Sequence, residues 1–323
     1  MTTLITGATG FVMSGLARHL ADRGHTLVAA DLHAPDAALR AHLGGLAGAV
    51  TFRQVDVTDA AAVRLLIGEV RPDRIVHGAA ITAIPPDAER GRFIETTRVN
   101  VLGTLQVLDA GREFGARRTV VVSSGSIYGV RADLTPVTED DAAQPQGVYP
   151  ITKWAAEALA RRYAAVNALD LAVVRLASPF GPFERDTGSR PLLSAIHAWT
   201  RAALSGETLL VGGPPTALRD PIYVDDVAAG IAAVLLAERL PNDVYNVSWG
   251  RGVTTEATLA ALARLIPGMK VALAPDAPPR WPSLARGPLS VDRLRHDLGW
   301  TPAYDLDSGL AAYAAWLRAT ERA

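Results

Sequence analysis

The chain contains no cysteine, which excludes disulfide bonds, thiolate nucleophiles and cysteine-ligated metals. Such a composition suits a reducing compartment. No apolar run reaches the ~18 residues that a membrane-spanning helix needs. The N-terminus enters a strand-like segment directly, without the basic stretch and apolar core of a secretion signal. We therefore expect a cytoplasmic protein.

An excess of charge of one sign is also missing. The 32 Lys and Arg residues nearly balance the 33 Asp and Glu residues, and no basic block stands out, so neither nucleic acid nor a membrane surface is an expected partner. The seven histidines show no metal-ligand spacing, so no metal site is expected. Apolar residues are abundant instead: they make up 49% of the 323 residues, enough for a sizeable core.

Short β-rich segments alternate with longer helical ones through the first half of the chain. The run Val120-Val121-Val122 is continuously apolar, as a parallel strand covered on both faces requires. This alternation predicts an α/β fold, a doubly wound (Rossmann) parallel sheet with right-handed crossovers. The expected strands are Thr3–Thr6, Thr26–Asp31, Thr51–Val55, Arg74–His77, Thr119–Ser123 and Leu171–Leu176. The main expected helices are Asp59–Val70, Phe93–Phe114 and Tyr149–Asn167.

The texture changes after about Leu176, where Pro, Gly and Arg become frequent and the elements become shorter. We expect residues 1–176 to form a dinucleotide-binding domain and residues 177–323 to form mainly a smaller, interleaved substrate-binding region. Because Asp225–Glu238 has the pattern of a core-facing helix, residues from about 222 to 248 are expected to return to the first domain.

The segment T-G-A-T-G-F-V-M-S-G, residues 6–15, joins the first expected strand to the first helix. Glycines such as Gly7 and Gly10 let the backbone approach a pyrophosphate, which the helix N-terminus attracts. Asp31 lies 24 residues after Gly7, near the spacing of a ribose-binding carboxylate, and favours NAD over NADP; a loop cap is the alternative. Met13 occupies the usual third glycine position, where it must either swing aside or press on the pyrophosphate.

Two further segments carry catalytic chemistry. Tyr149 and Lys153 are spaced i, i+4, so they share one helical face. A nearby ammonium lowers the pKa of a phenol, which makes Tyr149 a candidate general base. Ser124 lies at the carboxyl end of the fifth expected strand, where it could hold the oxygen being oxidised. A simple turn is the alternative for this serine-rich stretch.

With these motifs in this order, the sequence resembles the extended short-chain dehydrogenase/reductase family, of the NAD-dependent epimerase/dehydratase type. The resemblance covers nearly the whole chain. The matching segments are residues 6–11, 31, 56–57, 77–80, 99–104, 123–129, 149–153, 219–227, 245–247 and 298–302.

The resemblance implies NAD as the cofactor. Asn100 would lie behind the nicotinamide, unless it makes a purely structural hydrogen bond, and Asp56 would reach the adenine, unless it caps the helix that begins near Asp59. The implied cofactor-binding residues are Gly7, Thr9, Gly10, Phe11, Val12, Asp31, Asp56, Val57, Ala79, Ala80, Asn100, Tyr149, Lys153 and Pro179.

The resemblance also implies a catalytic set of Ser124, Tyr149 and Lys153. Tyr149 would be the acid/base, Lys153 would bind the nicotinamide ribose and tune Tyr149, and Ser124 would bond the reacting oxygen. The implied substrate contacts are Ser124, Gly125, Ser126, Tyr149, Ser178 and Arg219. Dehydratase relatives carry Thr-Asp-Glu at positions 124–126, so dehydration is less expected than epimerisation or net oxidation.

A small carbohydrate-like substrate is expected, and its identity stays open. A nucleotide-sugar epimerase is the first hypothesis, with Arg219 on the diphosphate; a salt bridge from Arg219 to Asp220 or Asp226 is the alternative. Two departures count against it: Ser178 replaces an Asn, and residues 280–288 lack an Arg-Pro-Gly-Asp-like motif. A dehydrogenase of a small sugar acid or polyol, with Arg185, Arg190 or Arg219 on a carboxylate, is the second hypothesis.

A catalytically idle NAD-binding regulator is the hypothesis from another class, and the intact Ser, Tyr and Lys set argues against it. Relatives commonly pair through two long helices, which correspond here to Phe93–Phe114 and Tyr149–Asn167. Apolar residues of the second helix, among them Trp154, Ala158 and Leu159, exceed what one buried face needs. A homodimer is therefore expected.

Overall fold

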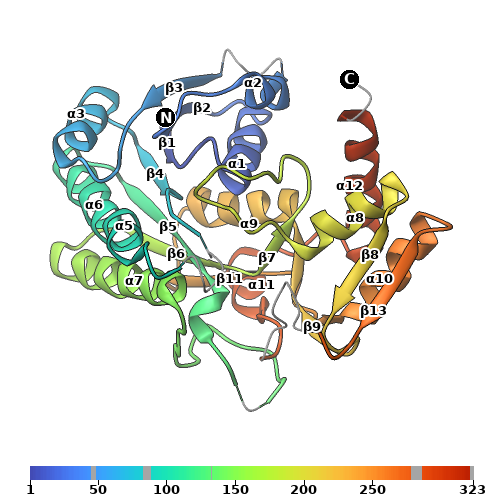
Figure 1. The fold of residues 1–323 in the computed structure, drawn as a ribbon. Helices are drawn as coiled ribbons and strands as arrows, with labels where there is room; N and C mark the ends of the chain where they lie inside the picture. The colour runs from blue at the N-terminus through green and yellow to red at the C-terminus, as the bar shows by residue number, and fades with distance from the viewer. Residues whose placement is uncertain (45–48, 83–88, 132, 278–285, 321–323) are drawn as a thin grey trace.

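The computed structural model describes residues 1–44, 49–82, 89–131, 133–277 and 286–320. Its centre is a seven-stranded parallel sheet with the order β11-β6-β5-β4-β1-β2-β3, which confirms the predicted fold class (Figure 1). The strands of this sheet are β1 (Thr2–Thr6), β2 (Thr26–Asp31), β3 (Val50–Gln54), β4 (Arg74–His77), β5 (Arg118–Ser124), β6 (Leu171–Leu176) and β11 (Val244–Val247).

Helices cover both faces of this sheet, which explains the continuously apolar strands. One layer holds α1 (Phe11–Ala21), which packs along α9 (Val224–Leu236); the other holds α3 (Ala60–Val70), α6 (Gly103–Glu113) and α7 (Val148–Asn167) (Figure 1). A short helix, α2 (Ala37–Leu43), follows β2. The largest apolar cluster fills the space between the sheet and the α1–α9 layer; its members include Leu16, Val120 and Ile231.

The chain after Leu176 contributes both to the main sheet with its helices and to a second lobe. Within the segment expected to return, α9 packs against α1 and β11 pairs with β6, and α11 (Asp292–Leu298) lies against β11. A second lobe at one side of the sheet has its own core around Trp199, Leu262 and Leu310 (Figure 1). Its elements are α8 (Ala195–Ser205), β8 (Thr208–Gly212), α10 (Thr255–Leu265), β13 (Lys270–Ala274) and α12 (Leu306–Thr320).

Two short strand pairs link these two parts. β7 (Ser178–Phe180), which follows β6 after one residue, pairs with β10 (Pro221–Tyr223), and β9 (Leu218–Arg219) pairs with β12 (Val253–Thr254). The strand β10 leads directly into α9. These connections bring residues from the second half of the chain to the carboxyl edge of the main sheet.

The expected helix Phe93–Phe114 is interrupted. The structure has α5 (Phe93–Thr97), a π-helical turn over Arg98–Leu102, and then α6. The prediction of one continuous α-helix was therefore wrong at this turn. The wider turn carries Asn100, which is fully buried and exchanges hydrogen bonds of 2.8 and 3.0 Å with the backbone of Ile81. Such turns often occur at functional sites.

Met13 packs into the core instead of standing over the loop. Its side chain is 3% exposed, and a Cβ added to Gly78 would lie 2.4 Å from its Sδ. The methionine therefore swings aside, towards the residue that follows β4. Because Gly78 has no side chain, the Met13 side chain fits beside it and does not have to stand over the glycine loop. We therefore expect Met13 to exert no steric pressure on a pyrophosphate.

This packing predicts non-additive stability effects. Gly78→Ala should cost about 1–3 kcal/mol through overpacking against Met13, and Met13→Ala about 2–5 kcal/mol through a cavity. In the double variant the new methyl group occupies part of that cavity, so the loss should be smaller than the sum of the two. Urea unfolding of the four proteins measures this. Additive losses would show that the two side-chain positions do not compete for space.

Candidate active site

The predicted site residues gather at one edge of the main sheet. All its strands are parallel, so their carboxyl ends meet at this edge, where open α/β sheets bind ligands. Gly7 follows β1, Asp31 ends β2, Ala79 comes after β4 and Ser124 ends β5. Pro179 lies in β7, just beyond β6. Residues scattered over the sequence are thus brought together by the sheet order alone.

The loop between β1 and α1 fits a pyrophosphate. Gly7 has a φ of +72°, and a Cβ there would lie 2.6 Å from the backbone nitrogen of Ala79. Gly10 is the N-cap of α1 and provides no side-chain acceptor, so no cap side chain occupies the first N–H groups of α1, from Phe11 and Val12 onward. A close backbone approach, N–H groups at a helix N-terminus and the positive end of its dipole are what a phosphate group needs.

Asp31 joins this loop to the end of β2. Its Oδ2 accepts a hydrogen bond of 2.9 Å from the Thr9 N–H, and its Oδ1 one of 3.3 Å from the His33 N–H. The carboxylate therefore does cap the loop, as the alternative held, while its side chain stays half-exposed. It holds the glycine loop against the second strand, and the ribose contact stays a prediction.

Asp56 does not cap α3. Asp59 accepts the N–H groups of Ala61 and Ala62, whereas the exposed Asp56 accepts only that of Thr58, at 2.8 Å. The alternative that Asp56 caps this helix was therefore wrong, and its contact with the adenine stays a prediction. The side chain of Val57 is buried against Gly103, so Val57 can offer a cofactor little beyond its backbone.

Ser124 and Tyr149 are hydrogen-bonded to each other. Ser124 Oγ also accepts the Ser126 N–H (3.1 Å) and lies 2.9 Å from Ser126 Oγ, so it caps a 3₁₀ turn as well as facing the tyrosine. Burial raises the pKa of Tyr149, while the bond to Ser124 and the positive charge of Arg190 lower it. On balance the pKa of Tyr149 is raised, because burial outweighs these two contributions. The tuning of Tyr149 by Lys153 stays a prediction.

Lys153 lies deeper, at 3% exposure. Burial lowers its pKa to about 8, and the carboxylate of Glu157, one helical turn further on, acts in the opposite direction. The ammonium form is therefore present below about pH 8 and is lost as the pH rises through that value. Burial, and then the charge of Lys153, lower the pKa of His77 to about 3.

His77 and its hydrogen-bond partners Thr6 and Thr104 form a buried, neutral network, here called the His77 floor, that the sequence analysis missed. His77 Nε2 lies 3.1 Å from Thr104 Oγ1, and its Nδ1 lies 2.8 Å from Thr6 Oγ1. Thr104 donates its single hydroxyl proton to the carbonyl of Asn100 (2.7 Å), so it can only accept from His77. The proton therefore resides on Nε2, and Thr6 donates to Nδ1.

Asn100 holds the loop after β4 against α7. One proton of its Nδ2 goes to the Ile81 carbonyl and the other to Thr152 Oγ1 at 3.0 Å. Both amide protons are thus used inside the protein, as the structural alternative held. A direct contact between Asn100 and the cofactor stays a prediction.

A buried ion pair, Glu157 with Arg175, lies close in the chain to the predicted catalytic residues Ser124 and Lys153. Glu157 accepts from Ser123 Oγ (2.8 Å) and from Arg175 Nε (3.1 and 3.2 Å). Arg175 Nη1 donates to Tyr128 Oη (2.6 Å), which in turn donates to Asn246 Oδ1 (2.9 Å). The network thus connects β5, β6, α7 and β11 at one level. The sequence indicates this network only through Glu157 and Arg175, two charged residues whose neighbours along the chain are mostly apolar.

Arg219 is half-buried and pairs with no carboxylate among the residues that the structure describes. Its Nε donates to Thr255 Oγ1 (3.3 Å), and its guanidinium lies over the Trp199 ring, 4.9 Å from the centroid. Burial lowers its pKa. The alternative of a salt bridge to Asp220 or Asp226 was therefore wrong.

Both aspartates have other partners. Asp220 accepts from Ser248 Oγ and the Leu289 N–H, and Asp226 accepts from the N–H groups of Ala303 and Tyr304.

The two departures from the family pattern lie close to Asp220. Ser178 is exposed, and its N–H donates to the Asp220 carbonyl (3.0 Å). Of residues 280–288, only 286–288 lie among the described residues. Arg286 is 4% exposed, with Nη1 3.9 Å from Asp220 Oδ2. A Cβ added to Gly125 would lie 3.0 Å from its Nη2, so this guanidinium borders the turn that follows Ser124.

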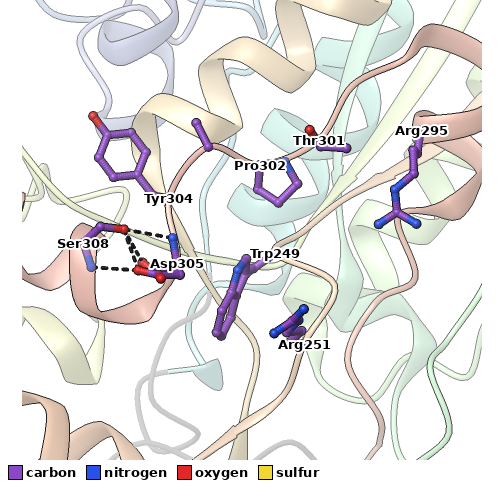
Figure 2. A pocket seen from close by; sticks show the side chains of 9 residues that line it. Trp249, Arg251, Arg295, Thr301, Pro302, Tyr304, Asp305 and Ser308 are labelled. Atoms are coloured by element: carbon purple, nitrogen blue, oxygen red, sulfur yellow. Dashed lines mark hydrogen bonds between the residues drawn. The ribbon is translucent and has the colours of Figure 1, made fainter.

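A surface hollow of about 420 Å³ is formed by the segments after β11 and before α12 (Figure 2). Arg251 lies over the Trp249 ring at its mouth, and Asp305 is bonded to Ser308. None of the predicted site residues lines it. Over the described part of the chain, no three His, Asp or Glu side chains are placed to hold a metal, and no helix is long and apolar enough to cross a membrane.

Known proteins share this architecture over the whole chain. A sequence profile of the NAD dependent epimerase/dehydratase family matches residues 3–248. UDP-glucose 4-epimerase of Mycolicibacterium smegmatis is 31% identical over 329 residues, which cover 98% of this chain and 99% of that protein. dTDP-glucose 4,6-dehydratase of Xanthomonas campestris pv. campestris is 28% identical, covering 98% of this chain and 92% of that protein.

Solved structures agree. MoeE5 in complex with UDP-glucose and NAD has a TM-score of 0.83 at 27% identity, with 99% of this chain and 100% of that chain covered. UDP-glucose 4-epimerase of Thermus thermophilus in complex with NAD has a TM-score of 0.84 at 28% identity, with 98% and 99% covered.

The fold and its glycine loop define a dinucleotide-dependent enzyme of the Rossmann type. The chain belongs to the NAD dependent epimerase/dehydratase family. The predicted family, the enzymatic class and NAD as cofactor are thereby confirmed. These relatives are nucleotide-sugar epimerases and dehydratases, and they leave the substrate of this chain to be proposed.

The buried pair predicts a large but repairable stability loss. Glu157→Gln should cost about 3–5 kcal/mol, because it leaves the Arg175 guanidinium buried without its counter-charge. Glu157→Leu combined with Arg175→Met removes both charges and should cost much less than the sum of the two single changes. Guanidinium chloride unfolding measures both.

The control is Glu113→Gln, which breaks the exposed pair with Arg64 and should have a much smaller effect. A small loss from Glu157→Gln as well would mean that the buried network is not a constraint on this fold.

Proposed function

We propose that the protein is a nucleotide-sugar epimerase of the UDP-glucose 4-epimerase kind. Arg219 carries this proposal: a half-buried guanidinium without a carboxylate partner in the described structure needs an anion, and a sugar-linked diphosphate is one. The similarity to the M. smegmatis epimerase supports it, as does that to MoeE5, which was solved with UDP-glucose.

The proposed chemistry assigns one task to each catalytic residue. Ser124 Oγ holds the hydroxyl that reacts, and Tyr149 Oη takes its proton. Bound NAD supplies the hydride acceptor. Lys153 holds the nicotinamide ribose with its ammonium. When the keto sugar presents its other face, the hydride returns from the cofactor to the same carbon, and Tyr149 returns the proton to the same oxygen, which leaves the sugar epimerised and the cofactor unchanged overall.

Dehydration has no support at this site, although several relatives are dehydratases. The turn after β5 reads Ser124-Gly125-Ser126 and offers no carboxylate that could remove a proton from carbon or protonate a leaving hydroxyl. Oxidation and reduction fit this turn, whereas elimination would need acids that residues 124–126 do not supply.

A second candidate is a dehydrogenase of a small sugar acid. Arg286 favours it, because this buried guanidinium borders Gly125 and could bind a carboxylate close to Ser124. Two of the other arginines expected to bind a carboxylate, Arg185 and Arg190, pair with Asp36 and Glu184. The two candidates differ in whether NADH accumulates.

The test is product analysis with NAD and a panel of UDP-sugars and sugar acids. We expect interconversion of UDP-glucose and UDP-galactose without net NADH. Tyr149→Phe should lower the turnover at least ~100-fold, because it removes the acid/base group, while NAD affinity stays within about threefold. Chromatography of the sugars, the NADH absorbance and a binding titration measure these quantities.

Tyr163→Phe serves as the control, since Tyr163 is a half-buried tyrosine on the same helix whose hydroxyl bonds Asp109 and Arg112 and none of the predicted site residues. Net NADH from a sugar acid, with no epimerised product, would replace the epimerase by the second candidate. Parental activity in Tyr149→Phe would mean that the catalytic assignment is wrong. Tight NAD binding without any turnover would favour an idle regulator.

We further propose that two copies pair through α5, α6 and α7. The outer side of this helical layer exposes large apolar side chains, among them Leu102 at 47%, Ile151 at 49% and Leu159 at 44%. Trp154, in contrast, is half-buried against the cluster around Ile127. A contiguous apolar surface of this kind is typical of an interface.

Light scattering tests the pairing. The parent should have the mass of a dimer, and Leu102→Glu combined with Leu159→Glu should have that of a monomer, because four charges would be buried per interface. Leu210→Glu, at a leucine of β8 in the second lobe that is even more exposed, should leave the dimer intact. A monomeric parent would overturn the proposal.

A further inference from the structure

The segment from Phe183 to Arg190, here called the strap, connects β7 to α8. It is anchored on both sides of the glycine loop. On one side, the Ser189 carbonyl accepts the N–H of Thr82 (2.8 Å) and its hydroxyl (3.2 Å) in the loop after β4. On the other side, Arg185 pairs with Asp36, which caps α2 after β2. The strap therefore spans the edge along which a dinucleotide would lie.

The first residue of the strap is fixed firmly. Phe183 is 5% exposed and has a φ of +68°, a conformation that a bulky residue adopts only when its surroundings enforce it. Its ring stacks on that of His42 in α2, with the centroids 4.6 Å apart. The Arg185 guanidinium also lies over the Phe183 ring, with its carbon 4.2 Å from the ring centroid. Its Nη2 lies 3.5 Å from the carbonyl oxygen of Thr9 in the glycine loop.

Arg190 reaches the centre of the site from the far end of the strap. Its guanidinium lies 5.4 Å from the centroid of Phe11, the first residue of α1, and its charge lowers the pKa of Tyr149 in the first turn of α7. Nη2 is held by Glu184 Oε1 at 2.8 Å. Glu184 itself is buried and also bonds the N–H and hydroxyl of Ser194, so the guanidinium is set by a rigid partner.

Both strap arginines have an unfilled hydrogen-bonding position. Across the described residues, the guanidinium nitrogens that are buried without any acceptor are the Nε atoms of Arg185 and Arg190. Buried donors in folded proteins are nearly always bonded. Two such donors on one short strap, both beside a loop built for phosphate, indicate an anion that belongs there.

We propose that the strap closes over NAD and that Arg190 binds its pyrophosphate from the side opposite the α1 N-terminus. Arg185 then fastens the strap to Asp36 and to the glycine loop. The helix N-terminus offers N–H groups and a partial charge, whereas a pyrophosphate is a dianion. A guanidinium adds a full charge and a planar set of donors, which matches phosphate oxygens.

The alternative ligand for Arg190 is the phosphate of the substrate, and binding measurements separate the two. NAD, ADP-ribose and UDP are titrated against the protein by calorimetry. Arg190→Ala should weaken NAD and ADP-ribose ~10-fold or more and by the same factor, because both contain the pyrophosphate, and should leave UDP unchanged. Arg162→Ala, which removes an exposed arginine of α7, is the control for net charge.

Loss of UDP binding with NAD binding intact would assign Arg190 to the substrate and overturn the proposal. Unchanged affinity for all three ligands would overturn it as well. If Arg190→Ala fails to fold because Glu184 loses its partner, Arg190→Lys decides: it keeps the charge but not the planar fork, and it should weaken NAD ~3-fold or more. Parental NAD affinity in Arg190→Lys would then contradict the proposal.

The fastening role of Arg185 has its own measurement. Arg185→Ala should accelerate the dissociation of NAD ~10-fold and change the association rate less, because the strap is no longer fastened over the cofactor. Stopped-flow fluorescence measures both rates. An unchanged dissociation rate would remove Arg185 from the proposal. Because these experiments follow cofactor binding alone, their outcome is independent of whether the substrate is a nucleotide sugar.

Discussion

The catalytic edge depends on one buried ion pair, Glu157 with Arg175. Two charges in a low-dielectric interior are tolerated only when every remaining donor and acceptor is satisfied. Ser123, Tyr128 and the Glu139 carbonyl provide those partners. Because the pair joins β6 to α7, and its partners come from β5, from the turn after β5 and from the loop that contains Glu139, satisfying the pair fixes these segments relative to one another.

The predicted catalytic residues are attached directly to this framework. Ser124 is the neighbour of Ser123, and Lys153 precedes Glu157 by one helical turn. Arg190 depends on a second buried carboxylate, Glu184, in the same way. The predicted site thus rests on two carboxylates that are not themselves among the predicted catalytic residues: Glu184 holds Arg190, whereas Glu157 holds Arg175 and opposes the lowering of the Lys153 pKa by burial.

The sequence predicted the strands β1 to β6 to within one residue at either end, because continuous apolar runs and glycine punctuation are local signals. It missed β11 (Val244–Val247), whose short apolar run is interrupted by the polar Asn246. The π-helical turn around Asn100 was also missed, since its apolar pattern differs little from that of an α-helix. Site residues such as Ser124 and Tyr149 were predictable from motifs. Their partners were not, because Arg185 and Asp36, or Met13 and Gly78, meet only after the chain has folded.

The His77 floor has a consequence for the movement of protons. Its hydroxyl and imidazole groups are saturated, and the direction of every hydrogen bond from Thr6 to the Asn100 carbonyl is fixed. With its pKa near 3, the imidazole stays neutral at every pH at which the protein is expected to work. The series of hydrogen bonds ends at the Asn100 carbonyl, which has no proton to pass on, so this buried network does not form a proton relay away from the site.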